Sequence, residues 1–226
     1  MNDPSSHWTA CKRGPKHNEC LRNSIQKTVP DLVKGLPNVG IMAIDPLRFS
    51  KIQIEQGTGP VSINLTLVDL EIKGLKNMII NEVKNDWKNM MLRITAPQLN
   101  LIGQYKIDGK VLILPVHGNG DSMFDLGNLT ANAVFRLSEK MIAGKRHYQV
   151  KAVDVKLATQ SLHLHFDNLF DGNKQLGDHF NEFINENWKE VFEELKPALE
   201  KAVKHACEST AGQFFTKVPK NEITPP

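Results

Sequence analysis

The sequence lacks the long apolar runs and the one-sided charge that would assign it to a membrane or to a nucleic acid. No stretch approaches the roughly 18 consecutive apolar residues that a membrane-spanning helix requires. Its 28 Lys and Arg residues nearly balance its 25 Asp and Glu residues, and the formal net charge of +3 indicates no dedicated nucleic-acid or membrane partner. Since 40% of the 226 residues are hydrophobic and no linker divides them, we expect one domain over residues 1–226, as a monomer.

Catalytic motifs are lacking too. The chain contains no Gly-x-Ser-x-Gly elbow, no His-Glu-x-x-His helix and no Walker loop. Residues 118–120 begin like a dinucleotide-binding loop, but Met123 stands where the third glycine belongs and a strand pattern follows, so we predict a turn there. His163 and His165 alternate with the apolar residues of a strand, which predicts that both imidazoles face solvent. We therefore predict no enzyme activity, no cofactor and no metal site.

Cysteine is scarce, at three residues. Cys11 and Cys20 enclose a short polar loop at a spacing that a disulfide closes easily. Zinc would need two further ligands, and His7 and His17 lie close enough in the sequence to keep that alternative open. Cys207 falls on the apolar side of a predicted helix, where we expect a buried and inert thiol.

Two N-glycosylation sequons begin at Asn64 and Asn128. Together with the pair of cysteines, they favour a secretory compartment. No signal peptide stands ahead of Asn2, so we expect a secreted, extracellular protein in its mature form.

Most of the chain before residue 170 is patterned as β-strands in which apolar and polar residues alternate. Asp108-Gly109 is a strong hairpin signal, and residues 57–60 supply another turn. The alternation slips by one residue after Leu67 and again after Ala152. Such a slip predicts a β-bulge, which bends a strand, so two of them favour a strongly curved antiparallel sheet.

Two segments have helical periodicity instead. Residues 21–33 form a short amphipathic pattern that ends at Gly35. Near the C-terminus, apolar residues recur at helical spacing and predict one helix from Lys174 to Lys217, about 65 Å long and kinked at Pro197. Its apolar arc of roughly 200° exceeds the width that a one-sided helix needs, so we expect the sheet to wrap around it.

Several short pieces occur in one order between Cys11 and Pro219, and the ordered set is specific although each piece alone is weak. The pieces are Cys11 and Cys20; Asp45-Pro46-Leu47; Ile52-x-Ile54-x-x-Gly57; Asp69-x-x-Ile72-x-Gly74-Leu75; Pro97-x-Leu99-x-x-x-Gly103-x-Tyr105-x-x-x-Gly109; Leu114-Pro115-x-x-Gly118-x-Gly120; Asn185-Glu186-Asn187-Trp188; Pro197; and Val218-Pro219. With this set, the chain resembles the insect takeout and juvenile hormone binding protein family.

The resemblance implies an α+β fold in which a highly curved antiparallel sheet wraps a long C-terminal helix, related to the tubular lipid-binding proteins. It further implies a secreted carrier that holds a hydrophobic ligand, such as a lipid, a fatty acid or a juvenile-hormone-like terpenoid, in an internal tunnel. The hormone-binding branch has a second disulfide, whereas this chain has the single unpaired Cys207. In this respect the chain resembles the takeout branch more closely.

Strand alternation and helix phase supply the residues that we expect to line such a tunnel. They are Met42, Ile44, Leu65, Leu67, Leu92, Leu101, Tyr105, Phe135, Leu137, Phe166, Phe180, Phe183, Ile184 and Val191. Tyr105 can also donate a hydrogen bond to a polar end of the ligand.

Three alternatives remain open. A membrane-docking lipid-transfer module would present an exposed apolar or basic patch at a tunnel mouth. An enzyme acting on a lipid would need an inward polar constellation, and the sequence displays none. A protein without any guest would serve only as an interaction partner.

Overall fold

The computed structural model describes residues 8–56 and 59–225, so the predicted turn at 57–60 lies partly outside the described residues. In chain order the elements are α1 (His17–Lys34), η2 (Pro37–Val39), β1 (Leu47–Gln56), β2 (Val61–Lys73), η3 (Leu75–Asn77), β3 (Ile79–Asn85), β4 (Asn89–Val111), β5 (Leu114–Ile142), β6 (Lys145–Ala158), β7 (Ser161–Phe166), η4 (Phe170–Gly172), α2 (Lys174–Glu186), α3 (Trp188–Lys217) and α4 (Lys220–Ile223). The helix predicted over 21–33 is confirmed as α1, which ends at Gly35 as expected.

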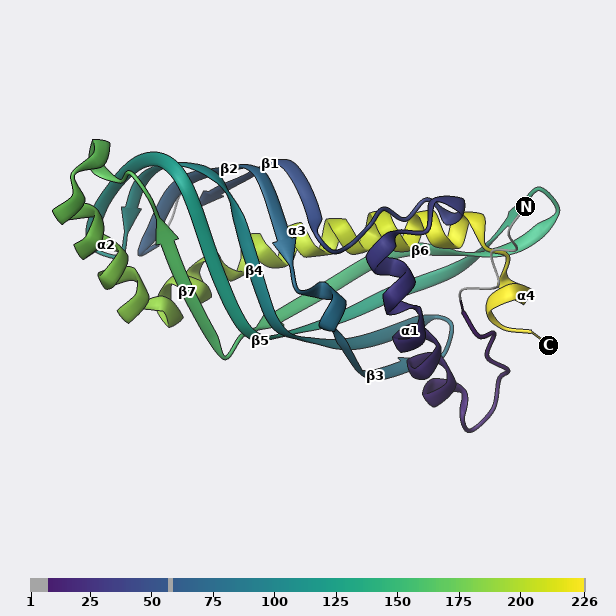
Figure 1. Ribbon diagram of the computed structural model, residues 1–226. Helices are drawn as coiled ribbons and strands as arrows, with labels where there is room; N and C mark the ends of the chain where they lie inside the picture. The colour runs from purple at the N-terminus through teal and green to yellow at the C-terminus, as the bar shows by residue number, and fades with distance from the viewer. Residues whose placement is uncertain (1–7, 57–58, 226) are drawn as a thin grey trace.

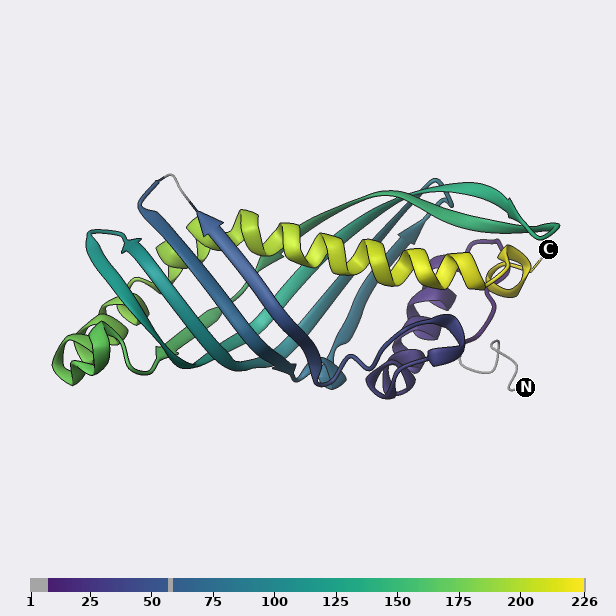
Figure 2. The same ribbon diagram turned by 90° about the horizontal axis from the view of Figure 1, so that it is seen from above.

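The described strands form one antiparallel sheet with the order β1-β2-β4-β5-β6, in which β3 pairs with β4 and β7 pairs with β5. The strands curl, and α3 runs lengthwise along the concave side of the sheet (Figures 1 and 2). Helices α1 and α4 lie at one end of the molecule, and α2 lies at the other. This architecture confirms the predicted fold class.

Both predicted β-bulges are present. The register of β2 on β4 shifts between Val68 and Glu71, and Asp69 has a positive φ of 50° within the bulge. On β6, Ala152 pairs with Arg136 and Val150 pairs with Leu137, so Lys151 is the extra residue. Because an extra residue on one strand increases local twist, these two positions bend the sheet.

The turns predicted at Asp108-Gly109 and at residues 118–120 are wrong. The glycines there lie within strands, where they allow neighbouring backbones to approach closely. Asp108-Gly109 lies inside β4, and residues 118–120 lie inside β5, whereas the β4–β5 turn falls at Leu112 and Ile113. A Cβ on Gly109 would lie 2.2 Å from the Ser62 carbonyl oxygen of β2. A Cβ on Gly120 would likewise lie 2.7 Å from a backbone oxygen of the neighbouring segment. Glycine in a strand interior often marks such an approach.

The predicted single helix from Lys174 to Lys217 is also wrong. It breaks at Asn187, where the backbone has φ −106° and ψ 20°, into α2 and α3. The Asn187 side-chain amide donates to the Phe183 carbonyl at 2.8 Å and so satisfies an acceptor at the end of α2. The helix α3 continues through Pro197. The wide apolar arc arose from reading two helices of different direction as one.

The helix α2 pairs with the free edge of β7 through two asparagine side chains. Asn185 accepts a hydrogen bond from the Leu164 amide at 2.8 Å and donates to the Leu164 carbonyl at 2.7 Å. Asn181 makes the same pair of bonds with Phe166, at 3.0 and 2.9 Å. Each carboxamide therefore takes the place of a neighbouring strand, and the i, i+4 spacing puts both on one side of α2.

We predict that Asn185→Ala lowers the free energy of unfolding by about 1–3 kcal/mol, because the backbone groups of the buried Leu164 lose their partner. Urea unfolding followed by circular dichroism measures the change. Asn221→Ala, at an exposed position of α4, is the control and should stay within about 0.5 kcal/mol of the unmodified chain. Equal urea midpoints for all three proteins would contradict this role of Asn185.

Candidate functional site: the apolar interior

The side chains between the sheet and the helices form two buried clusters. The terminal cluster is built around Trp87, Tyr148 and Phe215, where the Trp87 and Tyr148 rings stack at 4.4 Å. The distal cluster is built around Tyr105, Phe166 and Phe180. The two clusters meet under the first half of α3, where Val191 belongs to the distal cluster and the next residue to the terminal cluster.

Apolar side chains that lie between the two clusters are only half-buried. Leu162 of β7 and Leu199 of α3 each pack against both clusters and still keep accessible surface. Similar half-buried aliphatic residues continue along the interior: Leu92, Ile94, Leu101, Ala131, Leu195 and Val203. We call these eight residues the central strip.

Strand register shows that the sheet residues of the central strip face inward. Ile94 stands opposite the buried Ile80, and Leu101 stands opposite the buried Phe124. Directly opposed residues of antiparallel strands share one face of the sheet. Inward-facing aliphatic residues normally become fully buried, so accessible surface on the central strip indicates that its packing is incomplete.

Two hollows lie beside this interior. One of about 340 Å³ lies along β5 where its partner changes from β7 to β6. Pro97, Leu126 and Leu162 form its apolar part, and polar side chains such as Asp125 and His163 line the rest. The other, of about 640 Å³, lies between the bulge of β6 and the last turns of α3 and is lined mainly by polar side chains such as Lys151 and Lys217. The smaller hollow reaches the central strip through Leu162.

The structure divides the predicted lining residues between the two clusters. Ile44, Leu92, Phe135 and Leu137 belong to the terminal cluster or pack against it. The distal cluster receives Leu65, Leu67, Leu101, Tyr105, Phe166, Phe180, Phe183, Ile184 and Val191. Among all of these, only Ile44, Leu92, Leu101 and Phe183 are half-buried, and the others are buried. Sequence reasoning missed Leu162 and Leu199, although their place in strand alternation and helix phase was a usable signal.

Two of the predicted site residues need correction. Met42 is 76% exposed in the segment before β1, so it does not line the interior. The Tyr105 hydroxyl already donates to the Asp167 carbonyl at 2.6 Å. Burial, with a smaller effect of the Asp167 charge, raises the pKa of Tyr105 to about 12. Tyr105 therefore fastens β4 to the segment after β7 and is not a free donor for a ligand.

Buried polar atoms without a hydrogen-bond partner among the described residues gather in the terminal cluster. They include His17 Nε2, Trp87 Nε1 and the Tyr148 hydroxyl. The His17 and Trp87 rings lie 5.4 Å apart, and Trp87 stacks on Tyr148. This end of the interior is therefore less apolar than the central strip.

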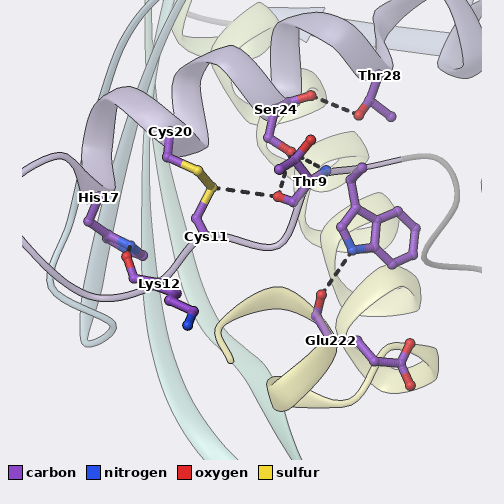
Figure 3. The surroundings of a disulfide bond; sticks show 9 residues. Thr9, Cys11, Lys12, His17, Cys20, Ser24, Thr28 and Glu222 are labelled. Atoms are coloured by element: carbon purple, nitrogen blue, oxygen red, sulfur yellow. Dashed lines mark hydrogen bonds between the residues drawn. A yellow bond between two sulfur atoms is a disulfide. The ribbon is translucent and has the colours of Figure 1, made fainter. Parts of the chain in front are cut away.

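The predicted disulfide between Cys11 and Cys20 is confirmed and fastens the N-terminal segment to α1 (Figure 3). Beside it, the Thr9 amide donates to Ser24 Oγ, and the Ser24 hydroxyl donates back to the Thr9 carbonyl, both at 2.9 Å. The Cys11 amide donates to the Ile223 carbonyl at 3.0 Å, which ties this segment to α4 as well.

The zinc alternative does not fit this arrangement. Both thiols of the pair are used in the disulfide, and His17 Nδ1 lies 2.9 Å from the Lys12 carbonyl oxygen. His7 lies outside the described residues, among which no group of metal-ligating side chains was found. His165 faces the carboxylate of Asp167 at 3.0 Å on the outer side of β7.

Within the same described ranges, no helix is both long and apolar enough to cross a bilayer.

Comparison with known proteins gives consistent matches along the chain. Residues 2–225 match the family model described as haemolymph juvenile hormone binding protein. Takeout 1 of Epiphyas postvittana is 30% identical, with a TM-score of 0.84 over 95% of this chain and 98% of that chain. The circadian clock-controlled protein daywake of Drosophila melanogaster is 28% identical over 215 residues, 90% of this chain and 82% of that protein. A putative beta-carotene-binding protein of Schistocerca gregaria is 28% identical over 123 residues, 53% of this chain and 48% of that protein.

We predict that native Cys207 reacts slowly with alkylating reagents. Burial, followed by the nearby charge of Glu208, raises the pKa of this thiol to about 11. At pH 8 about one molecule in a thousand would carry the thiolate, against about one in four for an unperturbed thiol. Mass spectrometry of iodoacetamide-treated protein should therefore show carbamidomethylation at least about tenfold faster in urea than in buffer. Equal rates in the two conditions would contradict the raised pKa.

Proposed function

Because the chain belongs to the haemolymph juvenile hormone binding protein family, we propose that it is a secreted, non-enzymatic carrier for one elongated hydrophobic molecule. The ligand lies between the curled sheet and α3, along the central strip. The observation that carries this proposal is the incomplete burial of inward-facing aliphatic side chains between two well-packed clusters.

Burial of apolar ligand surface drives binding in this proposal, at about 25 cal/mol per Å² removed from water. The 30 residues of α3 give the interior a length of about 45 Å, which suits an extended chain better than a compact one. The name of the Schistocerca relative refers to a long polyene, beta-carotene, and a guest of similarly extended, apolar shape is consistent with this length.

The ligand contacts belong to the central strip together with Phe183 and Ile44, which are half-buried at its margins. The buried aromatic residues of the two clusters act as end walls and keep the curled sheet in place around the guest. Fatty acids, juvenile hormone and other terpenoids all satisfy this apolar requirement, so the ligand class is tested by competition among them.

We predict that Leu199→Phe weakens uptake of a fluorescent fatty acid by about tenfold, because the larger ring occupies space beside the central strip. The midpoint of thermal unfolding should change little, since a half-buried position has room for the extra atoms. Leu176→Phe, at a 50% exposed site on α2, is the matched control and should bind as the unmodified chain does.

Native mass spectrometry of gently purified protein should also reveal a mass increment that corresponds to a lipid. Absence of both that increment and saturable uptake would overturn the carrier proposal. Unchanged uptake by Leu199→Phe would instead overturn only the placement of the ligand along the central strip.

A further inference from the structure

The strands β5 and β6 extend beyond the rest of the sheet as a two-stranded ribbon. Pairing of β4 with β5 ends at Arg136, and the Leu137 amide still donates to the Lys88 carbonyl at 2.7 Å, so residues 138–149 pair only with each other. The base of this terminal ribbon is held against α3, because His147 Nδ1 lies 3.0 Å from the Phe215 carbonyl oxygen and Tyr148 is buried beside the Phe215 ring. Its tip projects past the C-terminal end of α3 (Figures 1 and 2).

The tip of the terminal ribbon is apolar. Ala143 and Gly144 form the two-residue turn and have positive φ values of 47° and 78°, as a type I′ hairpin requires. Before the turn, Met141 is 59% exposed and Ile142 is half-buried. A side chain added at Gly144 would meet no atom within 4 Å, so the turn stands in open space.

Basic side chains surround this apolar tip. Lys140, Lys145 and Arg146 are exposed, and no acidic residue occurs from Lys140 to Val153. Neither Lys140 nor Lys145 has an ion-pair partner among the described residues. The nearest acid, Glu139, forms ion pairs with Lys220 and, at 3.8 Å, with Arg146.

The negative charge of Glu139, at the base of the tip, is paired with basic side chains. The hydrogen bond from Lys220, with the positive charges of Arg146 and Arg13 nearby, holds the pKa of Glu139 below its ordinary value. Glu139 is therefore paired with basic side chains, while Lys140 and Lys145 add positive charge beside it that no acid of the described residues pairs.

We propose that the tip of the terminal ribbon docks the protein on the surface of an anionic lipid bilayer. Lys140, Lys145 and Arg146 would lie at the level of the anionic headgroups, while Met141 and Ile142 enter the boundary between headgroups and acyl chains. An apolar insertion combined with basic residues gives reversible binding to such a surface. The contact would place one end of the elongated carrier at the membrane.

Cosedimentation of the full chain with phosphatidylcholine vesicles, with and without phosphatidylserine, tests this proposal. We expect binding only with phosphatidylserine and weakening at high salt. K140Q/K145Q should weaken it by about twenty-five-fold, at about fivefold for each charge. K106Q/K110Q removes two exposed lysines of β4, near the other end of the molecule, and should bind as the unmodified chain does. Equal weakening by both variants, or no dependence on phosphatidylserine, would overturn the proposal.

Replacement of the apolar tip separates a bilayer from a soluble polyanion. M141S/I142S should weaken vesicle binding by about tenfold, because two apolar side chains no longer leave water. Ile113→Ser, at the 79% exposed turn between β4 and β5, is the matched control and should have no effect. Unchanged binding of M141S/I142S would assign the basic patch to a polyanion and overturn bilayer docking. Circular dichroism verifies the fold of each variant, and fatty-acid uptake should remain unchanged in all of them, which keeps this test independent of the carrier proposal.

Discussion

Burial of one face of α3 along the concave side of the sheet is the constraint on which the rest of the structure depends. A helix of 30 residues needs a long apolar surface, and strands such as β5, with 29 residues, supply it only if they curve across the helix. Long strands resist bending while their hydrogen bonds are regular, so the extra residues near Asp69 and at Lys151 introduce the bends. Gly103 then lets the backbone of β4 approach the bulge closely, because a Cβ there would lie 3.0 Å from the Val68 carbonyl oxygen.

A curled sheet that does not close on itself leaves strand edges, and helix side chains cover two of them. Asn181 and Asn185 satisfy β7 from α2. On β6, Glu200 of α3 accepts from the Leu157 amide at 3.0 Å and from Lys156 at 2.9 Å. Burial would raise the pKa of Glu200, but these bonds outweigh it and leave the pKa below its ordinary value. At these positions both edges are thereby protected from pairing with another chain, without an additional strand.

The division of the interior explains how the proposed carrier can be stable although part of its interior is incompletely packed. Apolar contacts in the terminal and distal clusters provide the folding free energy, and the aromatic stack of Trp87 on Tyr148 rigidifies one end. The central strip contributes less, because half-buried aliphatic side chains lose fewer contacts with water. In the proposed function, a guest would complete the packing between these two clusters. The terminal ribbon then projects from the end that the disulfide and α4 hold together.

The sequence by itself determined the secondary-structure classes, the two bulges, the disulfide and the family. Hydrophobic period and slips in that period are local properties of the chain, and the ordered motifs from Cys11 to Pro219 are specific when taken together. Most predicted lining residues are buried for the same reason, since alternation identifies the inward face of a strand.

Only the tertiary structure decided where the C-terminal helix breaks, which glycines form turns and which inward-facing residues remain accessible. Asn187 breaks the helix although the apolar pattern continues across it, because α2 turns to pair with β7. Met42 reads as apolar lining but lies outside, and the Tyr105 hydroxyl is used by a backbone carbonyl 62 residues away. The accessibility of a side chain depends on how closely elements that are distant in the sequence pack against each other. Local periodicity contains no information about that packing. Alternation and helix phase could have identified Leu162 and Leu199 as inward residues, but only the structure shows that they lie between the two clusters and stay accessible.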